Sequence, residues 1–207
     1  MLEIKLADPK NDRDTIITKE QAEQHIRDLF RYIGEDPERT GLLGSPERIV
    51  RMWNEIFRGY DLSQKPKITT FSNGEDGLFY NEMIVDTGSF YSMCEHHSMP
   101  FFGRYWFSYI PETDGKIIGL SKIARMVDYC AARLQVQERL VTDIVEEINE
   151  ALGPGQHSVA LLLKGEHLCK TMRGVKKKGY MTSQCLTGAF KRIESQAEFF
   201  NFVNSNQ

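Results

Sequence analysis

Residues 101–110 have the sequence FFGRYWFSYI, in which aromatic and apolar side chains are dense and follow a period of two. Successive side chains of a β-strand point to opposite faces of the sheet, so this stretch predicts a strand. The same pattern begins at residue 83 and continues over residues 116–120, after a turn signal at Asp114 and Gly115. This part of the chain therefore predicts antiparallel strands.

Two helices are expected after these strands. Ser121 is the expected cap of the first helix, and the second runs from about Val136 to Leu152. Strands are expected again over residues 157–163 and 180–190. Strands, two helices and strands again predict an α+β domain with an antiparallel sheet and both helices on one face.

The N-terminal part of the chain is expected to be helical. Thr18 and Gln21 have the spacing of a capping box before an amphipathic helix. Ser45 and Pro46 mark the start of a second helix, with Ser45 as its N-cap and Pro46 at the first helical position. The C-terminal residues 195–203 can form either a short helix or a partner-binding tail. These patterns divide the chain into a flexible arm at 1–17, a helical region with its connection at 18–79, and the sheet-containing domain at 80–207.

The composition is that of an ordinary globular protein, because 41% of the 207 residues are hydrophobic and 27% are charged. The first residues show no apolar signal segment, and no apolar run approaches the ~20 residues that cross a bilayer. Four unevenly spaced cysteines do not resemble a secreted disulfide framework. We therefore expect a cytoplasmic protein without a membrane partner.

Positive charge gathers between Glu166 and Glu194, where Lys and Arg recur without an intervening acidic residue. A local positive field suits a phosphorylated ligand or a nucleic acid. A solvated basic loop is the commoner outcome for such a run.

Residues 92–97, with the sequence SMCEHH, place one thiol and two imidazoles within four residues. Cys94 and His97 have the spacing that lets two side chains of one turn bind a single ion, and thiolate and imidazole are ligands that Zn²⁺ prefers. The best third ligand is Cys169, because His167 and Cys169 form the only other place where Cys and His lie two apart. Three protein ligands leave one position for water, which is the catalytic arrangement.

The same residues also allow a structural interpretation. Cysteine is among the most buried residue types, so Cys94 and Cys169 can be core thiols and the histidines hydrogen-bonded core groups. The spacing by itself leaves both interpretations open.

Four segments resemble the GTP cyclohydrolase I family: SMCEHH at 92–97, IGLSKIAR at 118–125, RLQVQERL at 133–140 and His-x-Cys-x₃-Arg-Gly-Val at 167–175. The segments GEDPERTGLL at 34–43 and SPER at 45–48 are similar to the N-terminal helical region of that family. The resemblance covers nearly everything after residue 20, in order, and it favours the metal interpretation.

This resemblance implies a T-fold (tunnelling fold) whose sheets close into a barrel on oligomerisation, in a homodecamer of two pentamers with sites between subunits. It implies zinc-dependent hydrolysis of GTP to 7,8-dihydroneopterin triphosphate and formate, the first step of folate or pterin biosynthesis, with no nucleic-acid partner. Opening a purine at C8 needs a strong nucleophile at neutral pH and a proton for N7, which agrees with a zinc site beside a free histidine.

The resemblance also implies roles for individual residues. Cys94, His97 and Cys169 would bind zinc, His167 would protonate N7, and His96 would move protons in the later ribose rearrangement and ring closure. Ser121 would be a further catalytic residue. It would also hold the triphosphate and ribose, together with Lys122, Arg125 and Arg173, and Gln137 and Glu138 would contact the guanine.

One segment departs from the family pattern. Residues 182–188, TSQCLTG, stand where many members have Thr-Ser-Ala-x-x-Gly, which leaves the role of Cys185 open. Two rival functions are a T-fold reductase acting on a pterin or deazapurine through a lone cysteine without zinc, and a non-catalytic zinc-stabilised binding module with a fourth protein ligand. Metal content and the response to GTP separate these alternatives.

Overall fold

The computed structural model describes residues 17–75, 77–155 and 157–206, so most of the expected arm at 1–17 lies outside the described residues. The described residues form two compact units, one up to Ser63 and one from Gln64 onward. This boundary precedes the one expected between residues 79 and 80, because strand β1 (Thr70–Ser72) pairs with β4 (Lys116–Ile118) of the larger unit. In these ranges no helix has the length and apolar character needed to cross a membrane.

The first unit contains helices α1 (Lys19–Tyr32) and α2 (Ser45–Ile56), followed by the 3₁₀ turn η1 (Arg58–Tyr60). The predicted capping box is confirmed: the Thr18 hydroxyl accepts from the Gln21 N–H at 3.2 Å, and the Gln21 side chain accepts from the Thr18 N–H at 2.7 Å. The predicted Ser45 cap is wrong. The Gly44 carbonyl accepts the Arg48 N–H, so Gly44 is the cap and Ser45 is already helical.

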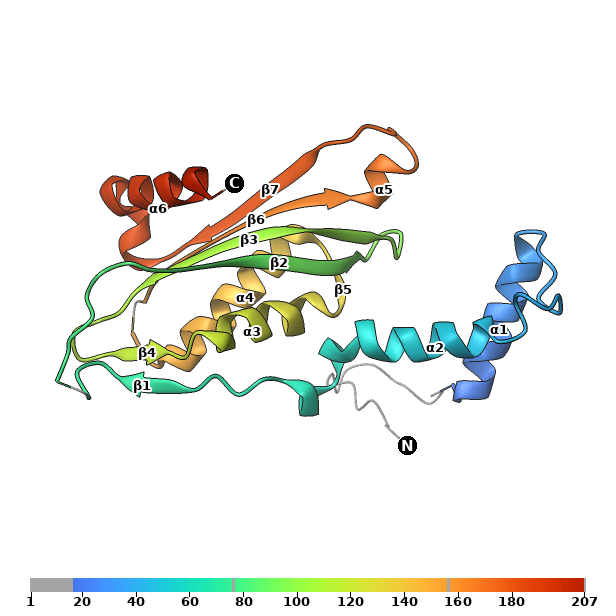
Figure 1. The fold of residues 1–207 in the computed structure, drawn as a ribbon, viewed down its shortest axis with the longest axis horizontal. Helices are drawn as coiled ribbons and strands as arrows, with labels where there is room; N and C mark the ends of the chain where they lie inside the picture. The colour runs from blue at the N-terminus through green and yellow to red at the C-terminus, as the bar shows by residue number, and fades with distance from the viewer. Residues whose placement is uncertain (1–16, 76, 156, 207) are drawn as a thin grey trace. The chain divides into compact units, whose positions relative to one another are not determined.

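The second unit is organised around a five-stranded sheet of order β5-β2-β3-β6-β7 (Figure 1). Its strands are β2 (Ile84–Cys94), β3 (Pro100–Ile110), β5 (Leu134–Gln135), β6 (Ser158–His167) and β7 (Tyr180–Leu186). The aromatic stretch forms β3, which lies in the middle and pairs with both β2 and β6. Both pairings are antiparallel, which confirms the predicted antiparallel strands. The strand expected to reach Phe190 ends at Leu186 instead, because the turn η3 (Gly188–Lys191) begins at Gly188 with a left-handed φ of 52°.

The alternation along β3 gives each face of the sheet its own apolar core. Tyr105 and Phe107 face the larger core, which is covered by α3 (Ser121–Ala131) and α4 (Gln137–Leu152); this confirms the two helices on one face (Figure 1). Trp106 points the other way, into a smaller core with Phe199 of α6 (Ile193–Ser205). The C-terminal segment is therefore a helix packed on its own chain.

The residue at the N-cap of helix α3 is not the predicted one. Leu120 has helical backbone angles and occupies the cap position, and the Lys122 N–H bonds to the Gly119 carbonyl at 2.8 Å. Ser121 therefore lies inside the first turn and makes no side-chain cap, so its predicted capping role is wrong.

Candidate metal centre and active site

The loop between β2 and β3 folds His97 back over the end of its own strand. Cys94 is the last residue of β2, and its carbonyl accepts hydrogen bonds from the N–H groups of Ser98 at 2.8 Å and His97 at 3.4 Å. The Cys94 N–H donates to the Met99 carbonyl at 2.8 Å, and Ser98 adopts a left-handed φ of 49° that closes the turn. This tight turn brings the side chains of Cys94 and His97 to the same place.

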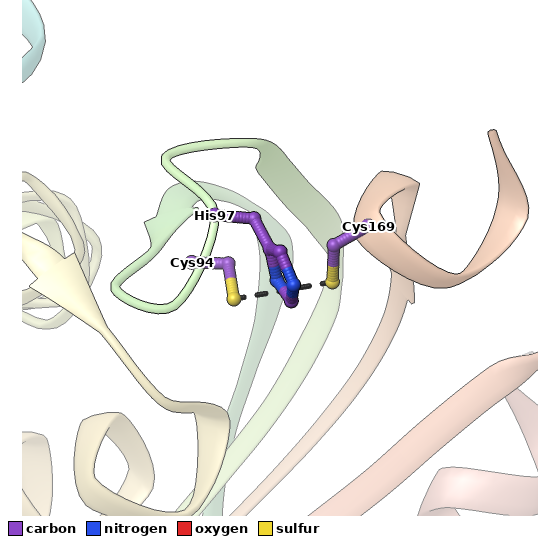
Figure 2. A group of neighbouring side chains, drawn as sticks. All are labelled: Cys94, His97 and Cys169. Atoms are coloured by element: carbon purple, nitrogen blue, oxygen red, sulfur yellow. Dashed lines mark hydrogen bonds between the residues drawn. The ribbon is translucent and has the colours of Figure 1, made fainter. Parts of the chain in front are cut away.

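Cys169 reaches that place from a distant part of the chain. In the β3–β6 pairing His167 lies opposite Phe101, so the end of β6 is beside the start of β3. Helix α5 (Leu168–Thr171) follows at once and carries Cys169. The sulfurs of Cys94 and Cys169 are 3.9 Å apart, and the ligand atoms of Cys94, His97 and Cys169 lie within 4.8 Å of one another (Figure 2). These three residues can therefore hold one metal ion.

The donor set fits a tetrahedral ion such as Zn²⁺. With Zn–S bonds of about 2.3 Å, two sulfurs on a tetrahedral ion lie about 3.8 Å apart, close to the 3.9 Å between these two. Burial, followed by the neighbouring Cys94 thiol, raises the pKa of Cys169. A bound cation would remove the repulsion between the two thiolates. The cluster is therefore better suited to holding a metal ion than to carrying two thiolates without one.

His167 lies next to this cluster but has other partners. Its ring stacks on Phe101, with ring centroids 4.5 Å apart and an interplanar angle of 5°. Its Nε2 atom is 3.0 Å from Oε1 of Gln137. Burial lowers the pKa of His167. The imidazole is therefore held in one orientation, partly shielded from water and outside the three-ligand cluster.

A polar network that was not predicted from the sequence ties the loop that carries His97 to the start of α4. Glu95 forms an ion pair with Arg139, and the Arg139 Nε donates to Oε1 of Gln135 at 2.9 Å. The Glu95 N–H donates to the Gln135 carbonyl at 3.0 Å, and the hydrogen bond from Arg139 lowers the pKa of Glu95. His96 is exposed, with Nδ1 3.7 Å from the Cys94 sulfur. Helical spacing did not signal this network, because Gln135 belongs to β5 and lies outside α4, and Glu95 lies 44 residues from Arg139.

Two adjacent residues at the start of α4 lie in different environments. Glu138 is exposed, and its charge acts on His167. Gln137 is 0% exposed, and its Nε2 lies 3.1 Å from the carbonyl oxygens of Leu163 and Met181. Glu138 is accessible to a ligand, whereas the carboxamide of Gln137, expected at the guanine, is engaged by protein groups.

Arg173 lies on the metal side of the unit, in the exposed loop after α5. Gly174 and Lys176 both have left-handed φ angles, of 61° and 51°, so the loop turns sharply there. The positive charge of Arg173 acts on Cys169. The basic run therefore begins beside the candidate metal ligands.

Ser121, Lys122 and Arg125 lie on the first turns of α3, and it is the other end of α3 that meets the metal-bearing strand. There the Ser92 hydroxyl, two residues before Cys94, donates to the Ala131 carbonyl at 2.7 Å. At 1.5 Å per residue, Ser121 lies about 15 Å along the helix from that point. Ser121 and Lys122 therefore lie at the end of α3 opposite the one that contacts the strand carrying Cys94.

Comparisons with known proteins match this chain over nearly its whole length. The family profile described as GTP cyclohydrolase I matches residues 22–204. A GTP cyclohydrolase 1 of Thermoanaerobacter pseudethanolicus is 44% identical over 195 residues, which are 93% of this chain and 100% of that protein. A GTP cyclohydrolase 1 of Bacillus subtilis is 44% identical over 179 residues, which are 84% of this chain and 90% of that protein. The crystal structure of an archaeosine synthase, QueF-Like, in the apo form superposes with a TM-score of 0.35 at 16% identity, covering 49% of this chain and 91% of that one.

Proposed function

Because the chain belongs to the GTP cyclohydrolase I family, we propose that it hydrolyses GTP to formate and 7,8-dihydroneopterin triphosphate, the first step of folate or pterin biosynthesis. The protein is an enzyme with the α+β T-fold of that family. The observation that carries the proposal is a three-ligand cluster, Cys94, His97 and Cys169, beside a separately held histidine, His167.

Cys94, His97 and Cys169 hold Zn²⁺ in this proposal. Two thiolates and one imidazole are a donor set that leaves zinc one open position. When bound there, zinc lowers the pKa of a water molecule and supplies the nucleophile for C8 of the guanine.

His167 delivers the proton that ring opening needs. The imidazole carbon of a purine is a poor electrophile until N7 is protonated, so a general acid must face N7. His167 suits this role because its ring is held by Phe101 and Gln137 and stays out of the ligand cluster. His96, exposed beside Cys94, moves protons in the later ribose rearrangement and ring closure.

Glu138 recognises the base. An ionised carboxylate accepts hydrogen bonds only, and guanine offers it two adjacent donors, N1–H and the 2-amino group, which adenine lacks. Arg173 binds the triphosphate from the basic loop, and Ser121, Lys122 and Arg125 of α3 bind triphosphate and ribose.

A second copy of the chain completes the site. The α3 residues lie at one end of that helix and the candidate metal cluster lies toward the other, and in this proposal the two sets that meet one GTP come from two chains. The sheet also offers edges for pairing: β7 is an edge strand, and β2 is covered only along two residues by β5. Membership of the family implies that copies join side by side in a homodecamer of two pentamers, which acts on GTP in the cytoplasm without a nucleic-acid or membrane partner.

The test is incubation of the zinc-loaded protein with GTP while formate and the absorbance of the dihydropterin product are measured. We expect both products in equal amounts, and neither from ATP. A zinc-loaded protein that leaves GTP unchanged would favour a zinc-stabilised binding module. A zinc-free protein that reduces a pterin or deazapurine would favour a T-fold reductase.

A further inference from the structure

The carboxamide of Gln137 has only one possible orientation. Its Nε2 atom lies 3.1 Å from each of three groups, the carbonyl oxygens of Leu163 and Met181 and the hydroxyl of Ser183. A carbonyl oxygen can only accept, so the NH₂ group must face these strands and Oε1 must face away. The Ser183 hydroxyl in turn donates to the backbone carbonyl of Gln137 at 3.3 Å, which leaves its lone pairs to accept from Nε2.

Strand β6 leaves a space for this carboxamide. A Cβ atom at Gly165 would lie 2.6 Å from Oε1 of Gln137 and 3.1 Å from the Phe90 ring. Gly165 lies two residues before His167, so both point to the same face of β6. The glycine lets the Gln137 oxygen reach the imidazole edge of His167.

The fixed amide decides which nitrogen of His167 carries a proton. Oε1 of Gln137 can only accept, and it is 3.0 Å from Nε2 of His167, so Nε2 must be the N–H donor in the neutral imidazole. Stacking on Phe101 keeps the ring in the plane that this hydrogen bond requires. Nδ1, on the other side of the ring, is then the nitrogen that can take up and release a second proton.

We propose that Gln137 is a positioning residue that holds the proton on Nε2 of His167, so that Nδ1 is the atom that exchanges protons with the substrate. The inference rests on the proposed function for its substrate. In the step concerned, the Nδ1–H bond of the imidazolium breaks, the N7–H bond of the guanine forms, and His167 becomes the neutral Nε2–H tautomer. The Gln137 side chain therefore acts through His167 rather than on the guanine.

A double-mutant cycle on the zinc-loaded, full-length enzyme tests this coupling. Gln137→Met is close in size and removes the acceptor, so kcat for formate release should fall about 100-fold, as for loss of an oriented general acid. KM for GTP and zinc content should stay close to those of the unaltered enzyme. In the His167→Ala background the same substitution should change kcat by less than about threefold, since the residue through which it acts is gone.

Ser183→Ala is the matched control, because it removes one partner of Nε2 and leaves the bond from His167 to Oε1 intact. We expect its kcat to remain within about threefold of the unaltered enzyme. Equal losses of kcat from Gln137→Met with and without His167 would overturn the proposal. A raised KM with unchanged kcat would also overturn it, because it would show that Gln137 contacts the guanine.

The tautomer can be read without turnover, which separates this inference from the proposed function. The measurement is an NMR spectrum of zinc-loaded protein labelled with ¹⁵N-histidine. The signals of His167 are those that are absent from the spectrum of His167→Ala. At alkaline pH we expect a protonated Nε2 and an unprotonated Nδ1, and the reverse pattern would refute the proposal even if GTP were not the substrate. Gln137→Glu, which keeps an acceptor toward Nε2, should retain this pattern if Gln137→Met does not fold.

Discussion

His97 and His167 lie near the same pair of sulfurs but differ in what surrounds their rings. The imidazole of His97 points toward the space between Cys94 and Cys169 (Figure 2), and the residue is exposed. The ring of His167 is stacked on Phe101 and hydrogen-bonded to Gln137. The first arrangement suits a ligand, and the second suits an acid or base whose orientation is fixed.

Substitution of these two histidines should therefore have different consequences. His97→Ala should lose both zinc and formate release, because two thiolates alone do not hold the ion firmly. His167→Ala should keep about one zinc per chain but lower kcat by about 100-fold or more, as for loss of a general acid. Metal analysis and single-turnover formate release distinguish the two variants, and a zinc-free His167→Ala with a zinc-loaded His97→Ala would reverse the assignment.

Removal of the metal should expose a redox-sensitive pair. The sulfurs of Cys94 and Cys169 are 3.9 Å apart, so a modest movement brings them to the ~2.05 Å of a disulfide. After chelation in air we expect a Cys94–Cys169 disulfide that blocks reloading with zinc until a reductant is added. Burial raises the pKa of Cys130 to about 12 and also raises that of Cys185, so both should stay thiols.

Differential alkylation followed by mass spectrometry measures all four cysteines in one experiment. Four alkylatable cysteines, together with full recovery of activity by zinc alone, would contradict the predicted disulfide. Oxidation of Cys130 or Cys185 in place of this pair would show that proximity at the metal site does not govern the reaction.

At the scale of elements, the link between α4 and the β2–β3 loop explains how a surface loop can hold ligands in place. Arg139 reaches back to Glu95, which directly follows the candidate ligand Cys94, while the Gln135 carbonyl accepts the backbone N–H of Glu95. Partners of this kind orient the ligands without touching the metal.

Arg139→Met should therefore weaken zinc binding by about 10-fold or more while changing the melting temperature little. The prediction is checked by competition with a zinc chelator. Lys65→Met is the matched control, because it removes another ion pair of α4, that of Lys65 with Glu147 at 2.7 Å, away from the loop. Equal chelator sensitivity of both variants would show that the Arg139 pair does not orient the loop.

The pairing of β3 with β6 depends on a close approach at Gly103. A Cβ atom there would overlap the backbone carbonyl of Lys164 and crowd the Cα of Gly165, so an alanine must push the two strands apart. Gly103→Ala should lower the free energy of unfolding by about 3 kcal/mol, and it should disturb the register that sets His167 beside Phe101. Gly119→Ala is the control, because its Cβ would come no closer than 3.5 Å to Thr69. The free energy of unfolding of both variants is measured by denaturant unfolding. Equal losses in the two variants would contradict this account.

At the scale of the whole molecule, the proposed site between two chains, with Ser121 and Lys122 from one and the metal cluster from the other, predicts complementation. In the proposed shared site, Lys122→Ala would disable the α3 half and His167→Ala would disable the half that carries the metal ligands. Each variant alone should be nearly inactive. Oligomers reassembled from an equal mixture should regain up to about a quarter of full activity, because that fraction of sites combines two intact halves.

The measurement is formate release after dissociation and joint reassembly, compared with each variant reassembled alone. Absence of any recovery from a mixed oligomer, verified by mass spectrometry, would place both halves of the site in one chain. Full activity in a monomeric fraction from size-exclusion chromatography would lead to the same conclusion.

The sequence by itself determined the features that depend on residues close together in the chain. The Thr18 capping box, the period of two in β3 and the tight turn joining Cys94 to His97 each involve residues within a few positions of one another. Local backbone geometry and hydrophobic alternation act over that range, so pattern alone predicts them. The scarcity of Cys and His also indicated Cys169 as the third member of the cluster.

Only the tertiary structure decided where the side chains of α4 go. Gln137 and Glu138 are neighbours in sequence, yet one fills the space above Gly165 and the other faces solvent. The link from Arg139 to Glu95 spans 44 residues, and the approach of Cys169 to Cys94 spans 75. These contacts depend on strand register and on how a helix docks against the sheet. Both are set by the packing of the whole unit, because burying one continuous apolar core fixes every element against the others at once.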